Sequence, residues 1–168
     1  MCTKGSGKCI KMTNSASEVA FLGNVKHKLD PKSRVAVPAD WRTAQGSTLR
    51  MLAATSEGYP VLKCYTEEGF ADKISGIRQE AKEQGAAPVQ IDHYIGVITG
   101  QCFVGEVSTQ GKLLIPKAQR ERLRLADQAS IVGRGSYFEI WNPGDFDLVS
   151  SPEAMKQLEL DKLFGILS

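Results

Sequence analysis

The clearest pattern of apolar and polar positions lies in residues 29–42, LDPKSRVAVPADWR. Asp30 and the proline after it predict a turn, because proline presets φ and an aspartate side chain bonds nearby backbone groups. The alternation over 34–37 predicts a short strand with side chains on opposite faces. Pro38 suits the first turn of a helix, which we expect to end at Gln45.

The pattern returns 78 positions later, in residues 107–120, VSTQGKLLIPKAQR. Lys112 then takes the place of Arg34, and Pro116 takes that of Pro38. Two copies predict two similar halves packed together, because a solenoid needs at least three repeats.

The remaining pattern predicts strands, hairpins and helices around these two stretches. Residues 66–84 place apolar side chains at helical spacing and predict a long helix. A terminal helix is expected over 151–163, with Ser151 as its N-cap and Pro152 as its first residue. The other expected elements are strands at 18–29, 102–108 and 112–115, hairpins at 49–65 and 130–141, and helical segments at 89–100, 116–123 and 143–147.

These elements divide the chain into four regions. Residues 1–19 are rich in small and polar residues without periodicity and predict a flexible tail. Residues 20–100 would form the first repeat with linking helices, and 101–147 the second repeat. A C-terminal helix would occupy 148–168.

Composition is ordinary for a globular protein, with 42% apolar residues among 168. The net charge is only +2 and the pI is about 8.3, whereas a strongly basic nucleic-acid domain has a pI above ~9. Total charge therefore does not predict DNA binding, and any such binding needs local clustering of cations.

Four cysteines, Cys2, Cys9, Cys64 and Cys102, show no paired metal-ligand spacing. We expect the last two to be buried free thiols, because free cysteine behaves as a small hydrophobe. No signal peptide or long apolar run is visible. We therefore expect a cytoplasmic protein without a metal, a cofactor or a membrane segment.

Arg34 is the residue best suited to sequence-specific chemistry. A guanidinium can bond guanine O6 and N7 in the major groove, which admits a two-stranded β ribbon, and gives roughly 1–3 kcal/mol of discrimination. Asp30 could orient that guanidinium or accept from cytosine N4. Lys26, Lys28 and Lys32 would contact phosphates, which position a protein without specifying a sequence.

A surface ion pair between Asp30 and Arg34, worth about 0–1 kcal/mol, is the alternative from residue types alone. The second copy is weaker, because Ser108 cannot form an ion pair and Lys112 cannot reproduce the arginine fork. We expect Lys112 to contact phosphates only.

Two further pairs of large side chains have structural explanations. Arg42 and Arg120 end the short helices at matched positions, where the helix dipole favours a cation. Trp41 and Trp141 lie in apolar patterns and are expected to be core or interface anchors.

The doubled pattern of strand, D-x-x-x-R, strand, proline and short helix resembles the MraZ family of AbrB-like regulators. The resemblance covers roughly residues 21–146 and rests most on LDPKSRVAVPADWR, TQGKLLIP and GRGSYFEIWN. It implies an α+β fold of tandem AbrB-like swapped-hairpin β-barrel halves with short helices and a C-terminal helix. The family motif falls on Asp30 and Arg34, and the second copy departs from it.

The resemblance also implies a function. It predicts a nucleoid-associated transcriptional regulator that binds double-stranded DNA at tandem promoter repeats, upstream of a division and cell-wall gene cluster including its own gene. It further implies a ring-shaped homo-oligomer. The alternative is an AbrB-fold interaction module, antitoxin-like or a ring adaptor, that binds protein instead of DNA.

Enzyme activity is not expected. The two histidines, His27 and His93, lie far apart in sequence, and no serine or cysteine lies in a nucleophile motif. The sequence therefore predicts neither catalytic residues nor a small-molecule substrate.

Overall fold

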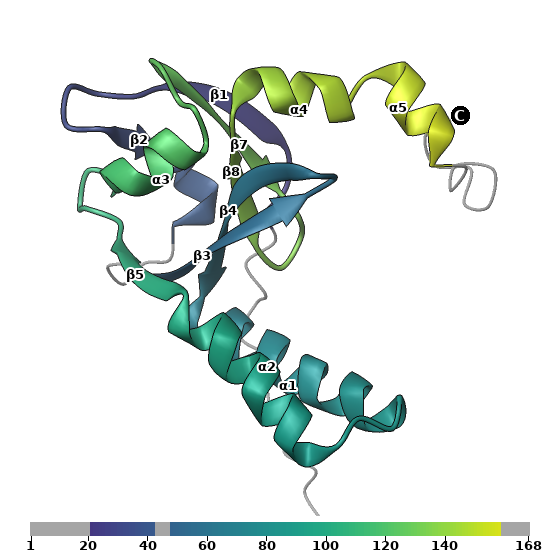
Figure 1. The fold of residues 1–168 in the computed structure, drawn as a ribbon. Helices are drawn as coiled ribbons and strands as arrows, with labels where there is room; N and C mark the ends of the chain where they lie inside the picture. The colour runs from purple at the N-terminus through teal and green to yellow at the C-terminus, as the bar shows by residue number, and fades with distance from the viewer. Residues whose placement is uncertain (1–20, 43–47, 159–168) are drawn as a thin grey trace, which may run out of the picture.

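The strands come from two segments of similar order on either side of a helical pair (Figure 1). The structure is a computed structural model and describes residues 21–42 and 48–158. The first segment holds β1 (Asn24–Lys28), β2 (Arg34–Ala36), the 3-10 turn η1 (Ala39–Trp41), β3 (Thr48–Ser56) and β4 (Tyr59–Thr66). The pair is α1 (Glu67–Glu83) and α2 (Pro88–Gly100). The second segment holds β5 (Cys102–Glu106), β6 (Lys112–Leu114), α3 (Lys117–Arg122), β7 (Gln128–Gly133) and β8 (Phe138–Trp141), before α4 (Pro143–Val149) and α5 (Pro152–Gln157).

The main sheet interleaves strands from both segments. Its antiparallel order is β1-β7-β8-β4-β3-β5. When each strand is exchanged for its counterpart in the other segment, the order reads the same from the opposite end. The first strand of each segment pairs with the other segment, β1 with β7 and β5 with β3. Each segment therefore depends on the other to complete this sheet.

The strands β2 and β6 form a two-stranded ribbon, the β2–β6 ribbon. It packs on the face of the main sheet that lines the hydrophobic core. Its register pairs Val35 with Leu113, and both side chains are fully buried. Burial of an aliphatic side chain of this size stabilises a fold by about 1.5–3 kcal/mol. The core they enter includes Val37, Met51, Leu62, Ile115, Ile131, Phe138 and Ile140 from both segments.

Both tryptophans are buried, as the sequence predicted. Trp41 lies 5.6 Å from Phe21 and 5.5 Å from Phe138, measured between ring centroids. Trp141 packs on the other face of the sheet, where Phe146 and Val149 of α4 cover it. Its indole Nε1 donates to the buried carboxylate of Glu139 at 2.8 Å, so the polar end of the ring is satisfied.

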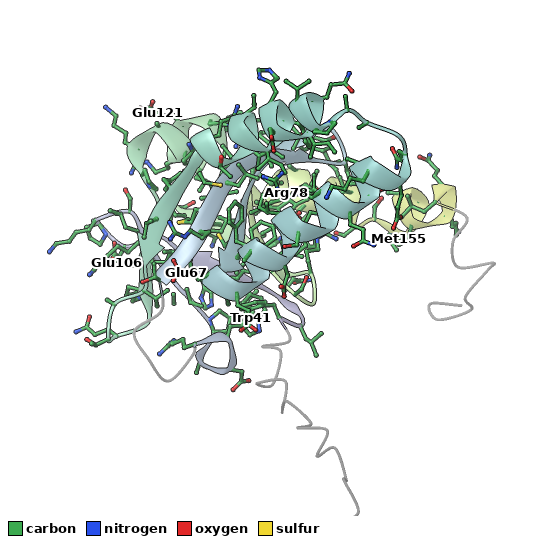
Figure 2. The ribbon with its side chains drawn as sticks, turned by 90° about the horizontal axis from the view of Figure 1, so that it is seen from below. Trp41, Glu67, Arg78, Glu106, Glu121 and Met155 are labelled. Carbon is green, nitrogen blue, oxygen red and sulfur yellow. The ribbon has the colours of Figure 1, made fainter. Side chains whose placement is uncertain are left out.

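The helices α1 and α2 extend together from one end of the sheet (Figure 1), and α1 crosses the molecule in the view of Figure 2. Thr66 caps α1 by accepting from the amide of Gly69 at 3.0 Å. Arg78 of α1 forms an ion pair with Asp92 of α2 at 2.7 Å. Only Ile91 and Ile95 of α2 are buried. This helix therefore packs against its surroundings mainly through the side that carries these two residues.

Most predicted elements are confirmed, including the α+β class, both linking helices, both hairpins and the Ser151 cap of α5. The expected helix over 38–45 is wrong within the described part, because only one 3-10 turn forms before residues 43–47, which lie outside the described residues. Within the described residues the first strand begins at Asn24, after Gly23 with a positive φ of 89°, and residues 18–20 of the expected strand lie outside the described residues. The tail 1–19 and residues 159–168 also lie outside the described residues.

We predict that two neighbouring substitutions in β6 change stability by very different amounts. Leu113→Ala empties a fully buried position and should lower the free energy of unfolding by about 2–5 kcal/mol. Leu114→Ala should change it by less than about 0.5 kcal/mol, because that side chain is 52% exposed. Urea unfolding followed by circular dichroism measures both changes in the free energy of unfolding. Equal losses would contradict the assignment of Leu113 to the inward face of the ribbon and Leu114 to its outward face.

Candidate nucleic-acid interface

The turn between β1 and β2 is built around the side chain of Asp30. Its Oδ1 accepts from the amides of Lys32 and Arg34, each at 2.9 Å. Its Oδ2 accepts from Nε of Arg34 at 2.7 Å. Ser33 takes a left-handed conformation with φ of 60° to close the turn. One carboxylate therefore holds both the backbone of the turn and the rotamer of Arg34.

These bonds also fix the charge state of Asp30. The backbone amide of Arg34, helped by the guanidinium and by the amide of Lys32, lowers the pKa of Asp30 below its ordinary value. The bonds therefore favour the ionised form of this carboxylate. The ion pair uses Nε of Arg34, whereas a guanine edge is bonded by the terminal nitrogens of the fork.

The second turn repeats the backbone geometry with different side chains. Ser108 Oγ accepts from the amide of Lys112 at 3.1 Å, in the place of the Asp30 carboxylate. The amide of Ser108 donates to the carbonyl of Lys112 at 2.9 Å, as Asp30 does to Arg34 at the same distance. Gly111 takes the left-handed position with φ of 76°. The turn is preserved, and the ion pair is absent because serine has no charge.

The β2–β6 ribbon presents one face away from the core. Because Val35 and Leu113 point inward, their neighbours along each strand point outward. The register places Arg34 opposite Leu114, and Ala36 opposite Lys112. Arg34 and Lys112 therefore occupy diagonal positions on one outward face, with 32% of the Arg34 side chain exposed.

The three lysines predicted around the first turn differ in their distance from this face and in their contacts. Lys28 and Lys32 are exposed near the first turn. Lys26 lies further along β1 and forms an ion pair with Asp147 of α4 at 2.8 Å. The structure thus brings Lys28, Lys32 and Arg34 to one end of the ribbon, and Lys112 to the other, while Lys26 is engaged by α4.

Two arginines at matched positions, Arg42 and Arg120, reach the turn of the opposite segment, which the sequence reasoning missed. Arg120 Nη1 donates to Ser33 Oγ at 2.5 Å, although the two lie 87 positions apart. At the matched position, Arg42 Nε donates to the carbonyl of Val37 at 2.9 Å, and its guanidinium lies over Gly111. The helix-dipole interpretation gave no reason for these contacts. The sequence did offer one signal for these contacts: the two arginines are separated by the same number of positions as the two turns.

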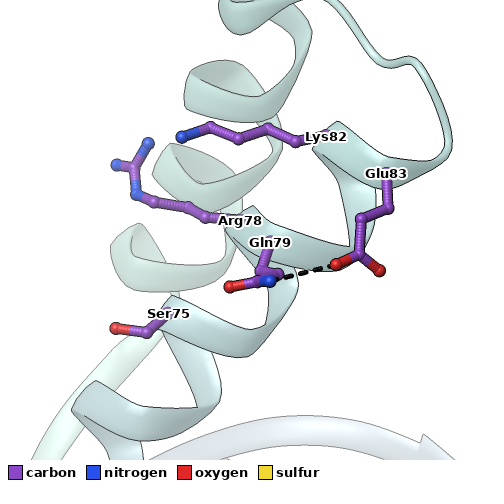
Figure 3. A pocket seen from close by; sticks show the side chains of 5 residues that line it. All are labelled: Ser75, Arg78, Gln79, Lys82 and Glu83. Carbon is purple, nitrogen blue, oxygen red and sulfur yellow. Dashed lines mark hydrogen bonds between the residues drawn. The ribbon is translucent and has the colours of Figure 1, made fainter.

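A pocket on α1 is lined by polar and charged side chains. Figure 3 shows a shallow pocket on α1 lined by Ser75, Arg78, Gln79, Lys82 and Glu83, with Gln79 bonded to Glu83 at 3.0 Å.

Within residues 21–42 and 48–158, no three His, Cys, Asp or Glu side chains are grouped to hold a metal ion. None of the helices described is long and apolar enough to span a membrane. Cys64 is a buried free thiol and Cys102 is half-buried, whereas Cys2 and Cys9 lie outside the described residues.

Comparisons with known proteins point to one family. No protein-family model matches the chain. The transcriptional regulator MraZ of Roseiflexus castenholzii is 30% identical over 151 residues, covering 85% of this chain and 96% of that protein. MraZ of Ruegeria pomeroyi is 27% identical, covering 84% and 90%. MraZ of Rickettsia canadensis is 29% identical, covering 76% and 84%.

One solved structure also resembles the chain in part. PHS018 from Pyrococcus horikoshii, known from its solution structure, is 14% identical, with a TM-score of 0.31 over 71% of this chain and 87% of that one. That overlap is too low to support a conclusion about the fold. The sequence relatives do support one: at this identity and over nearly the whole length of the Roseiflexus protein, the chain belongs to the MraZ family of transcriptional regulators.

Proposed function

We propose that this regulator binds specific DNA sequences by laying the outward face of the β2–β6 ribbon in the major groove. The observation that carries the proposal is Arg34, partly exposed on that face and held in one rotamer by Asp30. The major groove admits a two-stranded ribbon, and an arginine fork discriminates guanine by roughly 1–3 kcal/mol. Lys28 and Lys32 would contact the phosphates on either side.

The interleaved sheet supports AbrB-like swapped-hairpin halves as the underlying architecture. The strand order reads the same from both ends, and each segment donates its first strand to the other. In this proposal residues 20–100 and 101–147 are the two repeats. Asp30 and Arg34 form the DNA-recognition motif of the first repeat.

Each chain has one strong DNA-contacting turn in this proposal, at Arg34. Assembly of several chains on one DNA would raise the overall affinity. Linking weak sites raises avidity by roughly 10²–10⁴ without a new contact. We propose a ring-shaped homo-oligomer on tandem promoter repeats of a division and cell-wall gene cluster, including its own gene, in the cytoplasm at the nucleoid. This part rests on the likeness to the family.

A second candidate is a protein-interaction module without DNA binding. It is favoured by the net charge of only +2 and by exposed apolar side chains on α2, Val89, Tyr94 and Val97. Salt dependence separates the two, because a protein that neutralises phosphates loses DNA affinity steeply as salt rises. Affinity for the upstream region that is weak and indifferent to salt would favour the interaction module.

We predict that Arg34→Ala abolishes the preference for the chain's own upstream DNA over a shuffled fragment of equal length. Lys112→Ala should keep that preference and lower the slope of log affinity against log salt by about 0.9 for each phosphate that the variant no longer neutralises. Gel retardation over a salt series measures both quantities. Equal loss of preference in the two variants would show that the two turns read DNA in the same way.

A substitution borrowed from the second turn tests the role of Asp30. Asp30→Ser should keep the fold, because Ser108 bonds the same backbone position in its own turn. It removes a negative charge and the bond to Arg34, so affinity for shuffled DNA should rise while the specificity ratio falls. Thermal unfolding is the control, and an unchanged ratio would exclude an orienting role for Asp30.

A further inference from the structure

The second turn carries a guanidinium that its own sequence does not supply. Arg42 follows η1 in the first segment, yet its side chain lies over Gly111, so a Cβ at position 111 would fall on the guanidinium. The backbone links the same groups, because the amide of Val37 donates to the carbonyl of Gly111 at 2.9 Å. Arg42 Nε in turn donates to the carbonyl of Val37. The arginine is thereby fixed against the turn of the opposite segment.

Charge around the two turns shows what this contact changes. The first turn holds Lys28, Lys32 and Arg34 against one carboxylate, Asp30. In the second turn the matched positions hold Glu106, Gln110, Lys112 and Ser108. Lys112 and the exposed Glu106, labelled in Figure 2, cancel in formal charge. The second turn is therefore formally neutral by itself, and Arg42 makes it cationic.

The bond that holds Arg42 to Val37 does not neutralise its charge. Its bond from Nε goes to a neutral carbonyl, which does not compensate a cation. The residue is exposed, whereas Gly111 beneath it is buried. Lys112, on the outward face of the ribbon, adjoins Gly111 directly. A planar fork and an ammonium thus lie at the same end of the β2–β6 ribbon.

We propose that Arg42 completes the second DNA-contacting turn from the opposite half, so that each chain has two cationic ends on the ribbon. This inference rests on the proposed function and revises its expectation for Lys112, which would then act beside a guanidinium. Arg120, which bonds Ser33, takes the corresponding position at the first turn. The absence of any side chain at Gly111 is what allows Arg42 to lie there.

Hydroxyl-radical footprinting on the chain's own upstream fragment tests this assignment, because it shows where along the DNA each variant loses protection. The variants are Arg42→Gln, Lys112→Gln and Arg34→Gln. Glutamine at 42 retains a donor for the carbonyl of Val37 and removes the charge. Arg78→Gln, in the helical pair, is the matched control for the loss of an exposed arginine. Arg42→Lys keeps the charge without the fork and serves if the glutamine variant does not fold.

We expect Arg42→Gln to lose protection at the same positions as Lys112→Gln, with a salt slope lowered by about 0.9 for each phosphate left unneutralised. Arg42→Lys should weaken the same positions and leave the slope unchanged. Loss at the positions of Arg34→Gln, uniform loss along the fragment, or no loss would overturn the inference. If the wild-type chain protects no positions on this fragment beyond those on a shuffled one, the proposed function fails instead.

Discussion

The inward packing of Val35 and Leu113 constrains the rest of this molecule. These two side chains face each other across the β2–β6 ribbon and are removed from water completely. Strand geometry then requires the residues on either side of them to face outward. The positions of Arg34 and Lys112 on one exposed face thus follow from hydrophobic burial, before any consideration of DNA.

The same packing makes the two segments interdependent. Separating them would expose the ribbon core and leave β1 and β5 as unpaired edge strands, with their amides and carbonyls facing water. Two arginines also reach the turn of the opposite segment, where Arg120 bonds Ser33 and Arg42 lies over Gly111. The outward face of the ribbon is held in place by both segments, because neither segment can move without breaking the shared sheet.

Within this symmetric frame the two turns have diverged in charge while keeping their backbone. Asp30 and Ser108 make the same bond to the amide four residues on. Only the carboxylate also holds a guanidinium. Ser33 and Gly111 both take a positive φ, and an arginine of the opposite segment reaches each: Arg120 bonds the hydroxyl of Ser33, whereas Arg42 lies over the bare backbone of Gly111. Small changes in side chain thus separate the chemistry of the two ends without altering the fold.

Local pattern determined much of what is observed. The Asp30 turn, the α1 helix, the Ser151 cap and the inward-facing Val35 follow from short-range rules of turn chemistry, periodicity and alternation. The duplication was visible as a repeat, and so was the departure of Ser108 and Lys112 from the motif. Those rules act within a few residues, which is why a single sequence sufficed for them.

Only the tertiary structure decided which strands pair and which side chains meet across the repeat. Pairing of β1 with β7, the contact of Lys26 with Asp147, and the placement of Arg42 over Gly111 join residues that are far apart in the chain. Periodicity assigns a residue to a face, but it does not name the partner that will cover that face. The partner is set by the simultaneous burial of both halves, which is a property of the whole fold.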